Sequence, residues 1–399
     1  MHMIKRFWMW ACLCGILTGF LVSPAWAQAR HQATTQRPAL ATGAAFDPDG
    51  RLWVVGVNEQ GKLYTQSTPF PGPVRWTTAN EIDTGSDLVS ADGENRPKIA
   101  FGPKGWAVIT YTQPLPTPYA GLIRMLRSED AGLTFTRPFT VHDDRQPITH
   151  RFESVAFDGQ GHLYTVWVDK RDHRPGVPYV GAALYKKVST DGGRSFGPDQ
   201  KLADHSCECC RIALATDANG RLHGVWRHVF GTQTRDHAFT DLQVQPGKLV
   251  RATHDQWQIN ACPHHGPGLA RAWADDTSAD GFHLVWFGVR EGVAGVRYAR
   301  LGGDGEPVAD SVRLIPDPQA EHADVLANGP IVVIAWRSCA QGQTTLKLWR
   351  STDNGRHFDL ITLDQQIGPN DHPRLAQSGA RMAAVWRTPE RTLVYDLQP

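Results

Sequence analysis

The sequence predicts an all-β protein that folds as a β-propeller of four-stranded antiparallel blades. The octapeptide pattern Ser-x-Asp-x-Gly-x-x-Phe occurs three times, and a strand–turn–strand pattern that ends in an aromatic residue recurs every 50 to 60 residues. Long stretches with the 3.6-residue period of an amphipathic helix do not develop between the glycines and prolines. Because a unit of this length suits one four-stranded blade, we favour seven blades, or six if the two terminal units share one.

The first 27 residues have the pattern of a signal peptide. Lys5 and Arg6 precede an apolar run over residues 7–21, and Ala25-Trp26-Ala27 offers a small-x-small cleavage site. We therefore expect a single propeller domain over residues 28–399, exported to the periplasm or secreted. No later stretch approaches the ~20 apolar residues that a membrane span requires.

The charge of the chain is balanced, with 41 Lys and Arg against 40 Asp and Glu. Proteins that bind nucleic acid concentrate basic residues on one surface. The composition therefore gives no reason to expect a nucleic-acid partner.

The three octapeptides occupy residues 128–135, 189–196 and 351–358. In such a pattern the Asp carboxylate accepts backbone N–H groups in a tight turn, Gly supplies a positive φ, and Phe enters the core. The pattern resembles the Asp box of the sialidase (BNR-repeat) superfamily. That resemblance implies a propeller in which each box closes the turn between the third and fourth strands of a blade.

The longer repeat predicts the inner hairpin of each blade. Residues 155–167 align with residues 214–226, and each segment contains two apolar strands around an Asp/Gly turn. We expect the aromatic residues that end these segments to lie in the blade cores. They are Tyr111, Trp167, Trp226, Trp286, Trp336 and Trp386.

If these hairpins are the inner strands, the residues that enter the first strand and leave the second emerge on one face, opposite the Asp boxes. The positions concerned are rich in His, Arg and Cys, so the register predicts a polar rim around the propeller mouth. The candidate ligand-binding residues are Arg96, Arg151, Arg211, Arg337, Arg387, His322 and His372.

Cysteines and histidines cluster at two neighbouring positions of this rim, in residues 205–211 and 262–265. Sulfur together with imidazole nitrogen suits Cu(I) or zinc. Outside the cytosol we expect copper, so the main hypothesis is an exported propeller that binds a soft metal. The candidate metal ligands are Cys207, Cys209, Cys210, Cys262, His264, His265 and Cys339.

Disulfides are the alternative interpretation of these cysteines, because exported proteins form them. A Cys207–Cys262 bridge would join neighbouring blades, whereas the adjacent Cys209 and Cys210 cannot readily bridge each other. Five cysteines would still leave one thiol free. In that case no cofactor is expected, and the rim would serve as a scaffold that binds a glycan or a protein.

The resemblance also implies an enzymatic alternative, an exo-α-sialidase-type glycoside hydrolase. Sialidases clamp the substrate carboxylate with three arginines and use a Tyr nucleophile, a Glu partner and an Asp acid/base. Arg96 and Arg211 match the clamp best, with Arg151, Arg337 or Arg387 as the third.

Asp169 or Asp172 could serve as the acid/base, and Glu321 lies on the same expected face. The nucleophile has no match, because Tyr119 and Tyr179 fall in loops and Tyr395 falls in the last outer hairpin. The sequence therefore leaves open whether the protein is an enzyme.

Overall fold

The computed structural model describes residues 39–398, except 174–180, 245–246 and 276–278. The predicted signal peptide and Tyr179 lie outside the described residues. Strands dominate the described part, and its one helical element is the short 3-10 turn η1 (Pro103–Gly105). The predicted all-β class is therefore confirmed. No helix of this part has the length and apolar character needed to cross a membrane.

The first four units of the chain each contain four antiparallel strands, paired in chain order. The third and fourth units join into one eight-stranded sheet because Ser206 pairs with His228. The strands are β1 (Gly43–Phe46), β2 (Leu52–Val57), β3 (Leu63–Thr68) and β4 (Asn80–Glu81); β5 (Lys98–Phe101), β6 (Ala107–Pro114), β7 (Gly121–Ser128) and β8 (Phe139–Thr140); β9 (His150–Phe157), β10 (Leu163–Asp169), β11 (Ala182–Ser189) and β12 (Gln200–Ser206); β13 (Ala213–Thr216), β14 (Leu222–Phe230), β15 (Thr234–Asp241) and β16 (Val250–Arg251).

The remaining units are two four-stranded sheets and one three-stranded sheet. Their strands are β17 (Gly268–Ala272), β18 (Gly281–Arg290), β19 (Val293–Gly302) and β20 (Arg313–Leu314); β21 (Ala320–Asn328), β22 (Ile331–Ala340), β23 (Gln343–Ser351) and β24 (Asp359–Ile367); β25 (Arg374–Ser378), β26 (Arg381–Arg387) and β27 (Thr392–Asp396).

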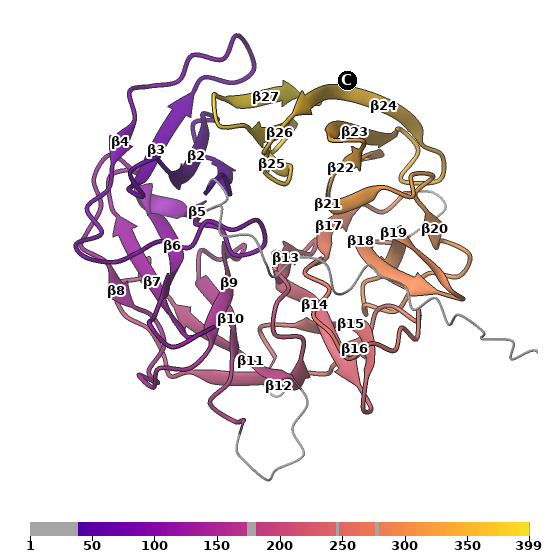
Figure 1. Ribbon diagram of the computed structural model, residues 1–399, viewed down its shortest axis with the longest axis horizontal. Coiled ribbons are helices and arrows are strands. Elements are labelled where there is room, and N and C mark those ends of the chain that lie inside the picture. Colours follow the sequence, from indigo (N-terminus) through magenta and orange to yellow (C-terminus); the bar gives the residue numbers. More distant parts are fainter. Residues whose placement is uncertain (1–38, 174–180, 245–246, 276–278, 399) are drawn as a thin grey trace, which may run out of the picture. The chain divides into compact units, whose positions relative to one another are not determined.

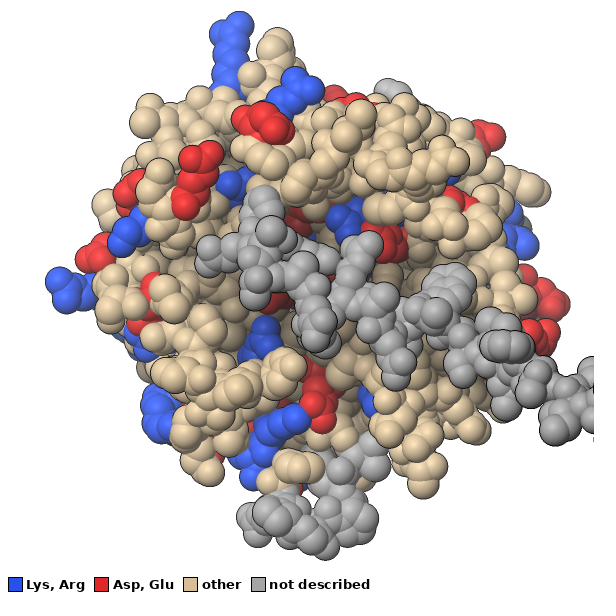
Figure 2. Space-filling view, viewed as in Figure 1, with Lys and Arg blue, Asp and Glu red and all other residues tan. Residues whose placement is uncertain are grey.

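The units follow one another around a common centre, from indigo β1–β4 to yellow β25–β27 (Figure 1). The innermost strands β1, β5, β9, β13, β17, β21 and β25 contact their neighbours in that order, and β25 contacts β1. This closed order of inner strands is the arrangement of a β-propeller. Acidic and basic side chains are interspersed on the face that Figure 2 shows, as the balanced composition leads one to expect.

The three Asp boxes lie between β7 and β8, β11 and β12, and β23 and β24, which are third-to-fourth strand turns as predicted. In the second box, Asp191 Oδ1 accepts the Ser195 N–H at 2.8 Å, and Ser189 Oγ accepts the Gly193 N–H at 2.8 Å. Gly193 has a φ of 85°, and Phe196 packs against the core of its blade. The boxes are therefore structural turns on the side opposite the mouth.

The aromatic residues that end the inner hairpins are core residues, as predicted. Trp167, Trp336 and Trp386 are fully buried. The Trp167 and Trp336 indole N–H groups donate to Asp169 and Asp317 at 2.8 and 2.9 Å. The strand register that these residues fix brings the starts of the innermost strands to one end of the ring, where the candidate site lies.

Candidate functional site

Four thiols gather where β12 ends and the next unit begins. Cys207 is anchored by its backbone N–H, which donates to the Arg227 carbonyl at 2.9 Å. Its Sγ lies 3.7 Å from Cys209 Sγ and 3.8 Å from Cys210 Sγ, and the latter two are 4.0 Å apart. The sulfur atoms of Cys207, Cys209 and Cys262 lie within 4.8 Å of one another. We call these four residues the thiol cluster.

The thiol cluster is buried on one side and open on the other. Cys207, Cys209 and Cys210 are buried, whereas Cys262 is exposed, and none of the four is in a disulfide. Hydrogen bonds from Cys209, Cys210 and Cys262 hold the pKa of Cys207 well below its ordinary value, and the Arg227 charge acts in the same direction. The thiolate is the form of cysteine that binds metals, and a lowered pKa favours that form.

Two of the other three predicted metal ligands, His265 and Cys339, lie in a separate group of side chains around Glu321. His264 is exposed, and His265 stacks on His322 with ring centroids 4.2 Å apart. Cys339 lies on β22 and its Sγ donates to Glu321 Oε1 at 3.2 Å. Cys339 and His265 therefore belong to a second group of side chains and not to the thiol cluster.

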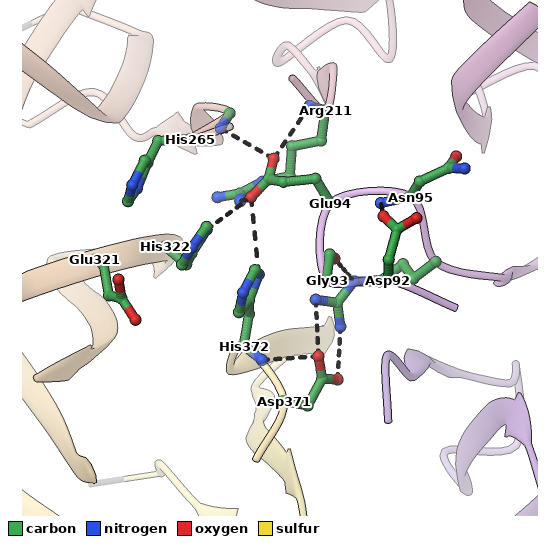
Figure 3. A network of polar contacts seen from close by, with 12 residues as sticks. Asp92, Gly93, Glu94, Asn95, Arg211, His265, Glu321, His322, Asp371 and His372 are labelled. Atoms are coloured by element: carbon green, nitrogen blue, oxygen red, sulfur yellow. Dashed lines mark hydrogen bonds and ion pairs between the residues drawn. The ribbon is translucent and has the colours of Figure 1, made fainter. Parts of the chain in front are cut away.

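Glu94 is the centre of the second group (Figure 3). Its Oε1 accepts hydrogen bonds from Arg211 Nη1 at 2.8 Å and from His322 Nδ1 at 2.9 Å. Its Oε2 accepts the backbone N–H groups of Arg211 and Gly266 at 3.1 and 2.9 Å. One carboxylate from the segment before β5 thus binds the segments before β13 and β17 and the start of β21.

Burial raises the pKa of Glu94, but the Arg211 charge and the His322 hydrogen bond outweigh it and hold that pKa well below the ordinary range. His372 Nδ1 lies 3.8 Å from the same carboxylate. The rings of His322 and His372 stack with centroids 3.4 Å apart. Burial lowers the pKa values of His265, His322 and His372, so these imidazoles are neutral at pH 7.

Comparisons with known proteins bear on this architecture. No family model matches the chain, and no curated protein matches it. Among solved structures, an ulvan lyase of polysaccharide lyase family PL25 is similar, with a TM-score of 0.55, 13% identity, and coverage of 89% of this chain and 91% of that chain.

The Hadza microbial sialidase Hz136 matches with a TM-score of 0.53 and 14% identity over 87% of this chain and 73% of that chain. The intramolecular trans-sialidase from Ruminococcus gnavus matches with a TM-score of 0.52 and 9% identity over 78% of this chain and 95% of that chain. The chain has the sialidase-like β-propeller fold. At these identities the likeness concerns the fold.

In this sialidase-like propeller, the two arginines that best match a carboxylate clamp already bind carboxylates of the chain. Arg96 binds Asp371 through two hydrogen bonds of 2.9 and 3.2 Å and also donates to the Thr42 carbonyl at 2.7 Å. Arg211 binds Glu94, and both arginines are buried. Their charges are therefore compensated within the protein.

The other three predicted arginines also have partners. Arg337 Nη2 lies 2.7 Å from Glu321 Oε1, and Arg387 Nη2 donates to the Val57 carbonyl at 2.8 Å. Arg151 has the weakest contact, 3.5 Å to the exposed Asp92. The side chains of Arg151 and Arg337 are equally exposed, so exposure does not single out either of them as the group that meets an external anion.

The predicted acid/base candidates are held in structural hydrogen bonds. The buried Asp169 accepts from Trp167 and, at 2.7 Å, from Arg171. Asp172 accepts the Tyr185 hydroxyl at 2.8 Å. These contacts place both aspartates among groups that stabilise the third unit.

Sequence reasoning missed Glu94. Its position could have marked it as a rim residue, because Glu94 directly precedes Asn95-Arg96, the pair at the entrance to an inner strand. Glu94 lines a cavity of about 240 Å³, together with residues that include Arg96 and Arg211. A second cavity, of about 310 Å³, is lined by residues that include Arg337, Asp371 and His372. The site thus combines two cavities, a histidine stack and a nearby thiol cluster.

Proposed function

We propose that this protein binds a soft metal ion, Cu(I) in particular, through Cys207, Cys209, Cys210 and Cys262. The separations of 3.7 to 4.0 Å among the sulfur atoms of the first three carry the proposal. Thiolates bound at ~2.3 Å to one tetrahedral ion lie about 3.8 Å apart, whereas a disulfide requires ~2.05 Å. The spacing suits a shared ion better than a sulfur–sulfur bond.

The ligand type favours copper or zinc over harder ions. Thiolate ligands select Cu(I) and Zn²⁺, and carboxylate-rich sites select Mg²⁺ or Ca²⁺. Three buried sulfurs with one exposed sulfur also suit metal transfer, because Cys262 can meet an incoming ion before the buried ligands close around it.

Elemental analysis of anaerobically purified protein from copper-supplemented cells tests this proposal. We expect about one copper per chain. Removal of a group that only orients a metal ligand lowers metal affinity by about 10- to 100-fold, so removal of a ligand itself in Cys207→Ser should lower copper affinity at least ~100-fold. Cys339→Ser is the matched control and should retain the metal.

Thiol counting under native and denaturing conditions completes this test. The proposal would be contradicted if the protein held no stoichiometric metal and if disulfides blocked all but one of its free cysteines. These cysteines are Cys207, Cys209, Cys210, Cys262 and Cys339. That result would favour the scaffold with disulfide staples.

A glycoside-active enzyme is the second candidate, and the structural comparisons favour it. The similar structures include a polysaccharide lyase and two sialidases, and the cavity that Glu94, Arg96 and Arg211 line has a mainly polar lining. The internal pairing of Arg96 and Arg211 argues against the three-arginine clamp of a sialidase.

Assays with a fluorogenic sialoside, with arabinan and with a uronate-containing polysaccharide test the second candidate. Turnover of one of these would support it, with release of sialic acid identifying the hydrolase form. Absence of turnover with all three would reject it and leave the metal proposal untouched.

A further inference from the structure

The start of β21 presents two consecutive side chains to the mouth. In a regular strand, neighbours such as Glu321 and His322 would point to opposite faces. Here the register against β22 shifts between Glu321 and Asp324, and His322 adopts a φ of 52°. A left-handed conformation is unfavourable for a residue other than glycine and persists only where the surrounding structure holds it. The bulge therefore directs both side chains toward one place at a conformational cost.

Glu321 and His322 meet His265 from the neighbouring unit. One ligand atom of each, two ring nitrogens and a carboxylate oxygen, lie within 4.8 Å of one another. Ligands bound at about 2.1 Å to one ion lie at most about 4.2 Å apart. The rings of His265 and His322 are stacked, with 10° between their planes. Because the lone pair of a ring nitrogen lies in the ring plane, His265 has to turn out of this stack before both rings can bind one ion.

Neighbouring groups orient these ligands. Glu94 accepts the hydrogen bond of His322 Nδ1, which leaves Nε2 of that ring with its lone pair. Arg337 and Cys339 hold Oε1 of Glu321. His265 Nδ1 is buried and has no hydrogen-bond partner among the described residues. A carboxylate behind a histidine and an unpartnered buried imidazole nitrogen are features of a metal-binding site.

We propose that His265, Glu321 and His322 form a second metal site, one that takes a borderline divalent ion such as Cu²⁺ or Zn²⁺ through nitrogen and oxygen. Two imidazoles and one carboxylate leave coordination positions open to water or to a ligand in the mouth. His372, stacked on the other face of His322, lies beside this site. The site shares no residue with the thiol cluster and does not depend on it.

The test uses a variant in which Cys207, Cys209, Cys210 and Cys262 are all replaced by serine, so that the thiol cluster cannot compete for the ion. Titration with Cu²⁺ should fill one site whose electron paramagnetic resonance spectrum shows coupling to imidazole nitrogen. His322→Gln in this background should weaken Cu²⁺ binding at least ~100-fold, since it removes a ligand and its carboxylate support together. The exposed His254, changed to Gln, is the matched control and should change nothing.

Stoichiometric binding that survives both His265→Gln and His322→Gln, or a spectrum without nitrogen coupling, would overturn this proposal. If this variant does not fold, the corresponding alanine variant, which buries no unpaired hydroxyl groups, gives the same measurement. Zn²⁺ supplies a second readout, because its binding should raise the melting temperature of the parent protein but not of its His322→Gln form. Failure here leaves the thiol site intact, and failure of the thiol site leaves this one intact.

Discussion

Replacement of Glu94 by alanine is expected to lower the free energy of unfolding by about 3–5 kcal/mol, the cost of removing one partner of a buried ion pair. The change leaves the buried Arg211 without its countercharge. It also removes the acceptor of the Arg211 and Gly266 backbone N–H groups and of His322 Nδ1. Denaturation in urea, followed by tryptophan fluorescence, measures the loss.

Two further variants separate the causes. Glu94→Gln keeps most of the shape and one acceptor oxygen but not the charge, so we expect an intermediate loss of stability. Glu129 is exposed and pairs with Arg127 at 2.6 Å on the Asp-box side. Glu129→Ala should leave the denaturation midpoint unchanged, because exposed pairs contribute little. A Glu94→Ala protein with the wild-type midpoint would show that this carboxylate does not hold the mouth together.

The architecture was predictable because its signals are local. Each Asp box carries its acceptor, its positive-φ glycine and its core aromatic residue within eight positions, so residues 189–196 specify their own turn. The inner hairpins likewise show alternating strands around an Asp/Gly turn. The proximity of Cys207 and Cys262 also followed from the sequence, because the repeat places both at the starts of neighbouring inner strands.

The partners of individual rim residues were not predictable in the same way. Glu94 and Arg211 are 117 positions apart and meet only because the ring of inner strands closes. The repeat places Arg211 at the mouth but does not tell which carboxylate compensates its charge. The bulge at His322 also escapes sequence reasoning, because a strand pattern alone predicts alternation. This is why His265 belongs with Glu321 and His322, although the sequence groups it with Cys262.

Acid sensitivity is the second large effect that we expect, and buried histidines cause it. His142 Nε2 accepts the Ile123 backbone N–H at 3.1 Å, and its Nδ1 donates to the Asp144 carbonyl, so the ring must be neutral. Burial, and then the stacked His150, lower the pKa of His142 to about 2. Burial, and then Arg300, lower the pKa of His283 to about 3.

Both rings stay neutral in the folded protein at pH values where the unfolded chain, with an ordinary pKa of 6.5, takes up a proton. Their contribution to stability is therefore complete above pH 6.5 and is lost as the pH falls toward the folded values. Because each ring takes up a proton only on unfolding, each should lower the free energy of unfolding by about 2 kcal/mol between pH 7.5 and pH 5.

Urea denaturation at pH 7.5, 6.5, 5.5 and 5 measures this loss, and the difference between wild type and a variant isolates one ring from all other titrating groups. His142→Leu removes a group that must stay neutral in the folded protein. Between pH 7.5 and pH 5, the free energy of unfolding of this variant should therefore fall by about 2 kcal/mol less than that of wild type. His254 is exposed, and its replacement by Asn should leave the pH dependence of the free energy of unfolding unchanged. Equal pH dependence of wild type and His142→Leu would mean that His142 takes up its proton without unfolding. The hydrogen bond from Ile123 would then have to be lost in the folded protein at pH 5, because a protonated ring has no lone pair to accept it.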